Sequence, residues 1–135
     1  MFRKPILIVA TAAALGAVGL VSAQAPMPGI TTPKANVVRI GDAEFNNIPD
    51  GRSIHRVNGT TVGLMTVQWP KGTVAERHNH GVELIVTVAS GQLKVMSGGE
   101  EFILAPGDVV AFPAWVDHGF EALEDTVTYE AAGPG

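Results

Sequence analysis

Residues 76–83 of this chain read ERHNHGVE, and a third histidine follows at His118. The chain has only 4 histidines, and three of them belong to this pattern. On an extended strand, His78 and His80 project from the same face. Neutral imidazole is the commonest protein ligand for a transition metal. The alternative interpretation is that His78 and His80 are simply an exposed pair in a polar segment. The third histidine, His118, favours metal binding over this alternative.

Two motifs surround these histidines. The first reads G-x5-H-x-H-x2-E-x7-G from Gly72 to Gly91, and the second reads G-x6-P-G-D-x4-P-x4-H from Gly99 to His118. Together they resemble the two motifs of the cupin family, small β-barrel domains that hold one metal ion inside the barrel. The resemblance covers nearly all of residues 37–130. Cupins include dioxygenases, decarboxylases, isomerases, sugar-binding domains and storage proteins, so the fold does not choose an activity.

The pattern of apolar residues predicts an all-β chain independently of that resemblance. Gly98-Gly99 suits a two-residue hairpin, and Pro106-Gly107 suits the centre of a type II turn. No convincing helical period follows Lys34, and turn signals recur every eight to twelve residues, which is typical of a sandwich or barrel. Six runs rich in β-branched or alternating apolar residues predict strands at 62–69, 82–89, 92–97, 101–104, 109–112 and 125–129. With the resemblance, the expected fold is a cupin-type double-sheet β-barrel, jelly-roll-like, in a single domain.

The first 25 residues have the parts of a secretory signal peptide. Arg3 and Lys4 are a short basic region, residues 6–21 are apolar, and Ala23-Gln24-Ala25 is a small-x-small cleavage site. A transmembrane anchor is the rival interpretation, but the run is rich in alanine and glycine. We expect residues 1–25 to be removed, residues 26–36 to be a flexible spacer and residues 37–131 to be the barrel. The localisation predicted is periplasmic or secreted.

Charge and composition exclude several functions. Removing a leader with two basic residues and no acid takes the net charge from −4 to −6, and no cluster of basic residues remains. This argues against nucleic acid as a partner, and against membrane surfaces after signal cleavage. The chain has no cysteine, so it has neither disulfides nor a cysteine nucleophile. About 110 remaining residues suffice for one packed domain.

The resemblance implies a metal centre formed by His78, His80 and His118, with Glu83 as the fourth ligand. Cupins commonly supply the fourth ligand as Glu or Gln four or five residues after the second histidine, and one subgroup reads Glu-Gln there with glutamine as ligand. This chain reads Glu83-Leu84. On an unbroken strand Leu84 would take the ligand position, whereas a bulge at Gly81 would turn Glu83 inward. Both arrangements stay open, and we expect Glu83 to be within reach.

This ligand set predicts one divalent transition metal ion, which is Mn, Fe, Ni, Co or Zn, and does not distinguish among them. The leading hypothesis is an exported metal-binding cupin acting on a small organic molecule by oxygenase, decarboxylase or isomerase chemistry. The alternative is a non-catalytic periplasmic barrel that binds or senses a small molecule. The sequence identifies no separate catalytic residue. We also expect a homodimer, because an open edge strand is otherwise a liability.

Overall fold

The structure is a computed structural model that describes residues 34–133. The predicted signal peptide and most of the predicted spacer lie outside the described residues. No helix in residues 34–133 is long and apolar enough to span a membrane. Strands are the main regular structure of the part described, and they are joined by turns and loops, with one short 3-10 helix at Ile40–Asp42.

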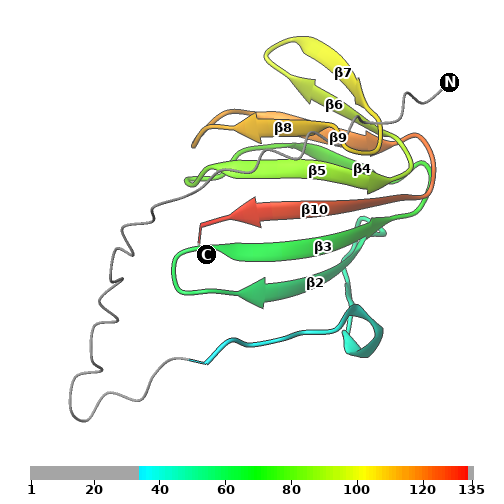
Figure 1. Cartoon of the computed structure of the whole chain (residues 1–135). Helices are drawn as coiled ribbons and strands as arrows, with labels where there is room; N and C mark the ends of the chain where they lie inside the picture. Colours follow the sequence, from blue (N-terminus) through cyan, green and yellow to red (C-terminus); the bar gives the residue numbers. More distant parts are fainter. Residues whose placement is uncertain (1–33, 134–135) are drawn as a thin grey trace, which may run out of the picture. The chain divides into compact units, whose positions relative to one another are not determined.

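Within residues 34–133, ten strands form two antiparallel sheets. The larger sheet has the order β1-β2-β3-β10-β5-β8, and Figure 1 shows its red strand β10 between β3 and β5. Its strands are β1 (Asn46–Asn47), β2 (Ser53–Asn58), β3 (Gly63–Trp69), β10 (Thr126–Ala132), β5 (Leu84–Ser90) and β8 (Val109–Phe112). The smaller sheet has the order β4-β9-β6-β7, with β4 (Val74–His78), β9 (His118–Ala122), β6 (Leu93–Ser97) and β7 (Glu100–Leu104).

The chain passes repeatedly from one sheet to the other. β3, β5, β8 and β10 belong to the larger sheet, whereas β4, β6, β7 and β9 belong to the smaller. This exchange gives the double-sheet, jelly-roll type of barrel. The predicted all-β, double-sheet barrel is therefore confirmed. Two of the connections between sheets, β4 to β5 and β8 to β9, contain the segments that flank the histidines.

The core lies between the sheets and follows the alternation of the strands. On β5, Leu84, Val86 and Val88 are buried, whereas Ile85 is exposed. β10 contributes buried residues of the same parity, but they are polar: Thr126, Thr128 and Glu130. Full burial of a side chain such as Val or Leu stabilises the fold by about 1.5–3 kcal/mol. The remaining buried apolar residues come from both sheets: Val67, Trp69, Ala75, Leu93, Val95, Phe112, Phe120 and Ala122.

Two predicted turns have the expected backbone. Gly98 and Gly99 have φ of 62° and 80°, as a hairpin between β6 and β7 requires. Gly107 has φ of 92°, and the Asp108 amide donates to the Ala105 carbonyl at 2.9 Å. These turns fix the register of β6 with β7 and the start of β8.

Candidate metal centre

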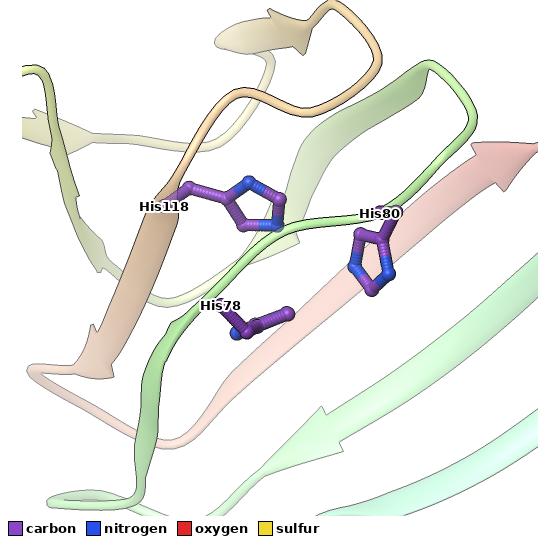
Figure 2. Close-up of side chains that lie close together, drawn as sticks. All are labelled: His78, His80 and His118. Carbon is purple, nitrogen blue, oxygen red and sulfur yellow. The ribbon is translucent and has the colours of Figure 1, made fainter.

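Three elements bring the histidines together. His78 is the last residue of β4, His80 lies two residues later in the connection to β5, and His118 is the first residue of β9. His78 and His118 pair directly across the β4–β9 ladder. Figure 2 shows the three imidazole rings around a common space. One ligand atom from each ring lies within 4.8 Å of the others.

The strand that carries the histidines differs from the one we expected. The sequence led us to expect one extended strand through His78 and His80, with a bulge at Gly81. Instead, β4 ends at His78, and its register with β9 shifts between Ala75 and His78. His80 therefore approaches the other two rings from a connecting segment, and strand parity does not govern residues 79–83.

Hydrogen bonds fix the rings of two histidines. The Nδ1 of His78 lies 2.6 Å from the Glu76 carbonyl, and the Nδ1 of His118 lies 2.9 Å from the Val116 carbonyl. Since a carbonyl only accepts, each Nδ1 carries the proton, and each Nε2 keeps its lone pair for a metal. The Nε2 of His118 is buried and has no hydrogen-bond partner. A buried polar atom without a partner is costly, and a metal ion at this place would satisfy it.

The surroundings favour neutral imidazoles. Burial lowers the pKa of His118, and the nearby charges of His78 and His80 lower it further. Burial, followed by the charge of His78, lowers the pKa of His80. Phe112 stacks on the His118 ring at 4.3 Å and 22°. Because metal ligands must be deprotonated, these effects keep the His80 and His118 rings ready to bind at neutral pH.

Asp117 connects the two residues on either side of His78. Its Oδ2 accepts a hydrogen bond from Arg77 Nε at 2.9 Å, and its Oδ1 accepts one from Asn79 Nδ2 at 2.7 Å. The Asn79 and Arg77 hydrogen bonds lower the pKa of the Asp117 carboxyl. Because Asp117 directly precedes His118, this carboxylate holds the His78 segment against the strand that carries the third histidine.

A second contact holds the His80 segment. The Trp115 amide donates to the His80 carbonyl at 2.7 Å, and Trp115 has a positive φ of 69°. Its indole covers Gly81, where an added Cβ would lie 3.0 Å from Cζ2. Gly81 therefore makes room for this ring. Trp115 also lines a cavity of about 780 Å³ on the smaller sheet, and the lining of that cavity includes none of the three histidines.

Glu83 does not join the three histidines. Its side chain is exposed, and the group of potential ligand atoms contains His78, His80 and His118 without it. Leu84, at the following position, is 3% exposed and begins β5. In this arrangement leucine takes the inward place and glutamate the outward one. Ligation by Glu83 is therefore an untested prediction from the sequence, and the exposure of this side chain favours a centre of three histidines.

The barrel also contains a buried carboxyl that was not predicted from the sequence. Glu130 on β10 is 5% exposed, and its Oε1 accepts a hydrogen bond from Thr128 Oγ1 at 2.8 Å. Trp69 Nε1 donates to the same hydroxyl at 2.9 Å. Burial raises the pKa of Glu130, against the effects of Thr128 and of the positive charges of Arg52 and His78. The predicted strand stopped at Tyr129, one residue too early to place Glu130 on the inner face.

The remaining histidine lies elsewhere. His55 on β2 places its Nδ1 3.0 Å from the Glu44 carbonyl, and its ring lies 5.7 Å from that of Phe45. It belongs to neither motif and is not in the group of potential ligands. His55 is therefore a natural control for the other three.

The structure thus combines a double-sheet barrel with three convergent histidines, one at the end of β4, one in the connection that follows it and one at the start of β9. Residues 65–129 match the family described as "Cupin domain". Together with the fold, this match supports the cupin family for this chain. Among curated proteins, none matches the chain.

Solved structures agree with this assignment. KdgF from Halomonas sp. is 25% identical with a TM-score of 0.71, covering 76% of this chain and 96% of that one. An RmlC-like cupin from Shewanella frigidimarina is 19% identical with a TM-score of 0.71, covering 76% and 93%. A predicted oxalate decarboxylase from Thermotoga maritima is 16% identical with a TM-score of 0.66, covering 73% and 97%. The likeness to the last two concerns the fold alone.

Proposed function

We propose that this chain is an exported cupin that binds one divalent transition metal ion through His78, His80 and His118 and acts on a small organic molecule. The observation that carries the proposal is the convergence of three imidazoles, with one ligand atom from each within 4.8 Å of the others. The Nε2 of His118 is buried and unpartnered within this group, whereas the Nε2 of His55, also unpartnered, lies outside it. Three neutral nitrogen ligands suit Mn, Fe, Co, Ni or Zn.

When bound, the metal would supply Lewis-acid chemistry, or dioxygen activation if it is iron. The chain's own residues bind and orient. His78 and His118 keep fixed tautomers through backbone carbonyls, and the Asp117 carboxylate holds the residues that flank His78. Three protein ligands leave coordination positions for a substrate.

Glu130 is the acidic side chain suited to hold a proton inside the barrel. Burial raises its pKa, and it senses the charge of His78. A carboxyl whose pKa is raised toward neutrality is suited to general acid or base catalysis. A positioned acid or base can serve oxygenase, decarboxylase or isomerase chemistry, so this residue supports an enzyme without choosing the reaction.

A non-catalytic binding or sensing barrel is the second candidate, and Leu84 is the observation that favours it. Leucine is buried where related cupins place a carboxylate or carboxamide ligand. A site without that ligand can hold a metal and a small molecule while having lost turnover. Removal of Glu130 separates the two candidates, because it should abolish turnover in an enzyme and leave ligand binding in a sensor.

The first test measures the N-terminus and the metal content of the exported protein. The full-length chain, expressed in a Gram-negative host and purified from the periplasm without chelator, should begin near Gln24 or Pro26 by mass spectrometry. Elemental analysis should find close to one transition-metal ion per chain. Full-length protein retained in the inner membrane would contradict export, and metal-free protein from metal-replete cells would contradict the metal centre.

A further inference from the structure

Arg56 lies on the inner face of the larger sheet. On β2, Ile54 packs against the core, and Arg56 follows two residues later. Across the ladder, Arg56 pairs with Met65, which also packs against the core. Alternation along a strand therefore places Arg56 on the same face as these two residues, although its side chain extends to an exposed position.

Three contacts fix the Arg56 guanidinium. Nε donates to Asn58 Oδ1 at 2.6 Å, Nη2 donates to the Gly133 carbonyl at 3.4 Å, and Nη1 lies 3.8 Å from Met65 Sδ. The group rests on Gly63, where an added Cβ would lie 2.9 Å from Nη2. The absence of a side chain at Gly63 makes this position available. The guanidinium is thus held in one place before any ligand binds.

The positive charge of Arg56 is not balanced by a carboxylate. The ion pairs within residues 34–133 join Arg52 to Asp50, Arg77 to Asp117 and Lys94 to Glu121, and Arg56 is in none of them. A guanidinium has five N–H donors. Three are directed at Asn58, Met65 and Gly133, so one N–H remains on each terminal nitrogen. These N–H groups are available to a carboxylate, which a guanidinium can bind through two N–H groups at once.

This guanidinium lies at the same end of the barrel as the histidines. Gly133, whose carbonyl it contacts, packs on Val82: an added Cβ there would lie 3.4 Å from Val82 Cγ1. Val82 comes two residues after His80. The register of the larger sheet agrees, because a row of paired residues runs from Asn58 through Gly63, Ala132 and Leu84 to Phe112, which stacks on His118.

We propose that Arg56 binds a carboxylate group of the molecule that reaches the three-histidine centre, so the ligand is a small organic acid. The proposal deepens the proposed function and rests on it for the position of the metal. Arg77 is closer to the histidines in sequence, but Asp117 already neutralises it. Three neutral imidazoles would leave the charge of a divalent ion uncompensated, which also favours an anionic ligand.

The test compares carboxylates with their uncharged amides. Isotope-labelled protein, both zinc-loaded and chelator-treated, is titrated with benzoate and benzamide, succinate and succinamide, and glucuronate and glucuronamide. Binding is followed by NMR at the Arg56 side-chain Nε–H and at the Gly63 and Gly133 amides. At least one acid should bind ten-fold or more tightly than its amide, with shifts at Arg56. The preference should weaken as ionic strength rises.

Variants assign the effect to the guanidinium. Arg56→Gln should reduce the preference for the acid to less than two-fold, and Arg56→Lys should keep part of it because charge remains without the planar fork. Arg39→Gln is the matched control, since Arg39 is exposed on the 3-10 helix side and has the same charge. It should retain the full preference. Zinc affinity should change less than two-fold in all three variants.

Two results would overturn the proposal: no pair is separated ten-fold in the parent protein, or Arg56→Gln keeps the preference. Acid binding that requires zinc and ignores Arg56 would assign the carboxylate to the metal alone, leaving the proposed function intact. Absence of zinc binding would instead refute the proposed function. The titration of chelator-treated protein would still show whether Arg56 binds a carboxylate.

Discussion

At the scale of single residues, the histidines were predictable and their inner neighbours were not. His78, His80 and His118 stand at motif spacings that are visible in the sequence. Arg56 and Glu130 lie on strands more than seventy residues apart in the sequence. They lie at the same end of the barrel because both pair with Met65. Such register depends on long-range pairing, which the local pattern does not encode.

Glu83 and Leu84 test the fourth ligand. With Glu83 exposed, Glu83→Ala should change zinc affinity less than two-fold and stability by no more than about 0.5 kcal/mol. Leu84→Gln should cost about 1–3 kcal/mol without metal, because a polar amide is buried. With metal it should recover stability, since the amide oxygen gains a partner. A steep loss of zinc affinity in Glu83→Ala, measured by calorimetry, would instead place Glu83 in the coordination set.

Glu130→Gln tests the buried carboxyl through the pH dependence of stability. The folded pKa of Glu130 is raised above its ordinary value of 4.5, so the folded state prefers the protonated form. Its favourable contribution is complete below about pH 4.5 and declines as the pH rises through the folded pKa. Glutamine keeps an oxygen for Thr128 and does not ionise.

Chelator-treated Glu130→Gln should therefore melt above the parent protein at pH 8, with a difference that shrinks toward pH 5. Each unit of pKa shift corresponds to about 1.4 kcal/mol. Thr66→Val, on the outer face of β3, provides a control for a polar change without a titratable group. A melting difference that is constant between pH 5 and 8 would show that the Glu130 carboxyl is not perturbed by burial.

At the scale of elements, the strands with a clear run of apolar residues were predicted from the sequence. The strands in which polar residues interrupt the apolar ones were missed. Histidines, arginines or glutamates interrupt the apolar residues of β2, β4 and β9, so the apolar pattern of these strands is weak. They form strands because their neighbours in the sheets supply hydrogen-bond partners and one buried face. The functional residues lie mainly on these weakly patterned strands, so the site elements were the hardest to delimit.

Alanine substitutions at two glycines, Gly91 and Gly99, can distinguish the cost of backbone strain from the cost of a steric clash. Gly91 and Gly99 have φ of 83° and 80°, so alanine at either position costs about 1–2 kcal/mol for the left-handed conformation. At Gly99 an added Cβ meets nothing within 4 Å, whereas at Gly91 it would lie 2.4 Å from the Asp125 carbonyl oxygen. Gly91→Ala should therefore destabilise by at least about 1 kcal/mol more than Gly99→Ala in urea unfolding. Equal losses would show that the Gly91 turn tolerates a Cβ.

At the scale of the whole molecule, the outer face of the larger sheet is the surface suited to a second copy. Leu64, Ile85 and Tyr129 are 48%, 41% and 42% exposed on neighbouring strands. Ala131 pairs with both Leu64 and Ile85, so these side chains form one apolar surface. Contiguous exposed apolar surface of this kind marks interaction sites.

We therefore expect a homodimer formed through this face. Light scattering should give twice the mass of the mature chain, and Ile85→Lys should shift the protein toward monomer by burying a charge in the contact. Ile103→Lys is the control, because Ile103 is equally apolar and 61% exposed but lies on β7 of the other sheet. A monomer at all concentrations would contradict the expectation, as would equal dissociation by both variants.

Calorimetric titration of the chelator-treated protein with zinc tests the central claim most directly. The parent protein should bind one ion per chain, and His118→Ala or His78→Ala should lower the affinity by at least a hundred-fold, while His55→Ala stays within two-fold. Because metal ligands must be deprotonated and the pKa values of His80 and His118 are lowered, zinc affinity should hold at neutral pH and fall as the pH drops below about 6.5. Equal losses in all three variants, or no zinc binding by the parent at neutral pH, would contradict the account.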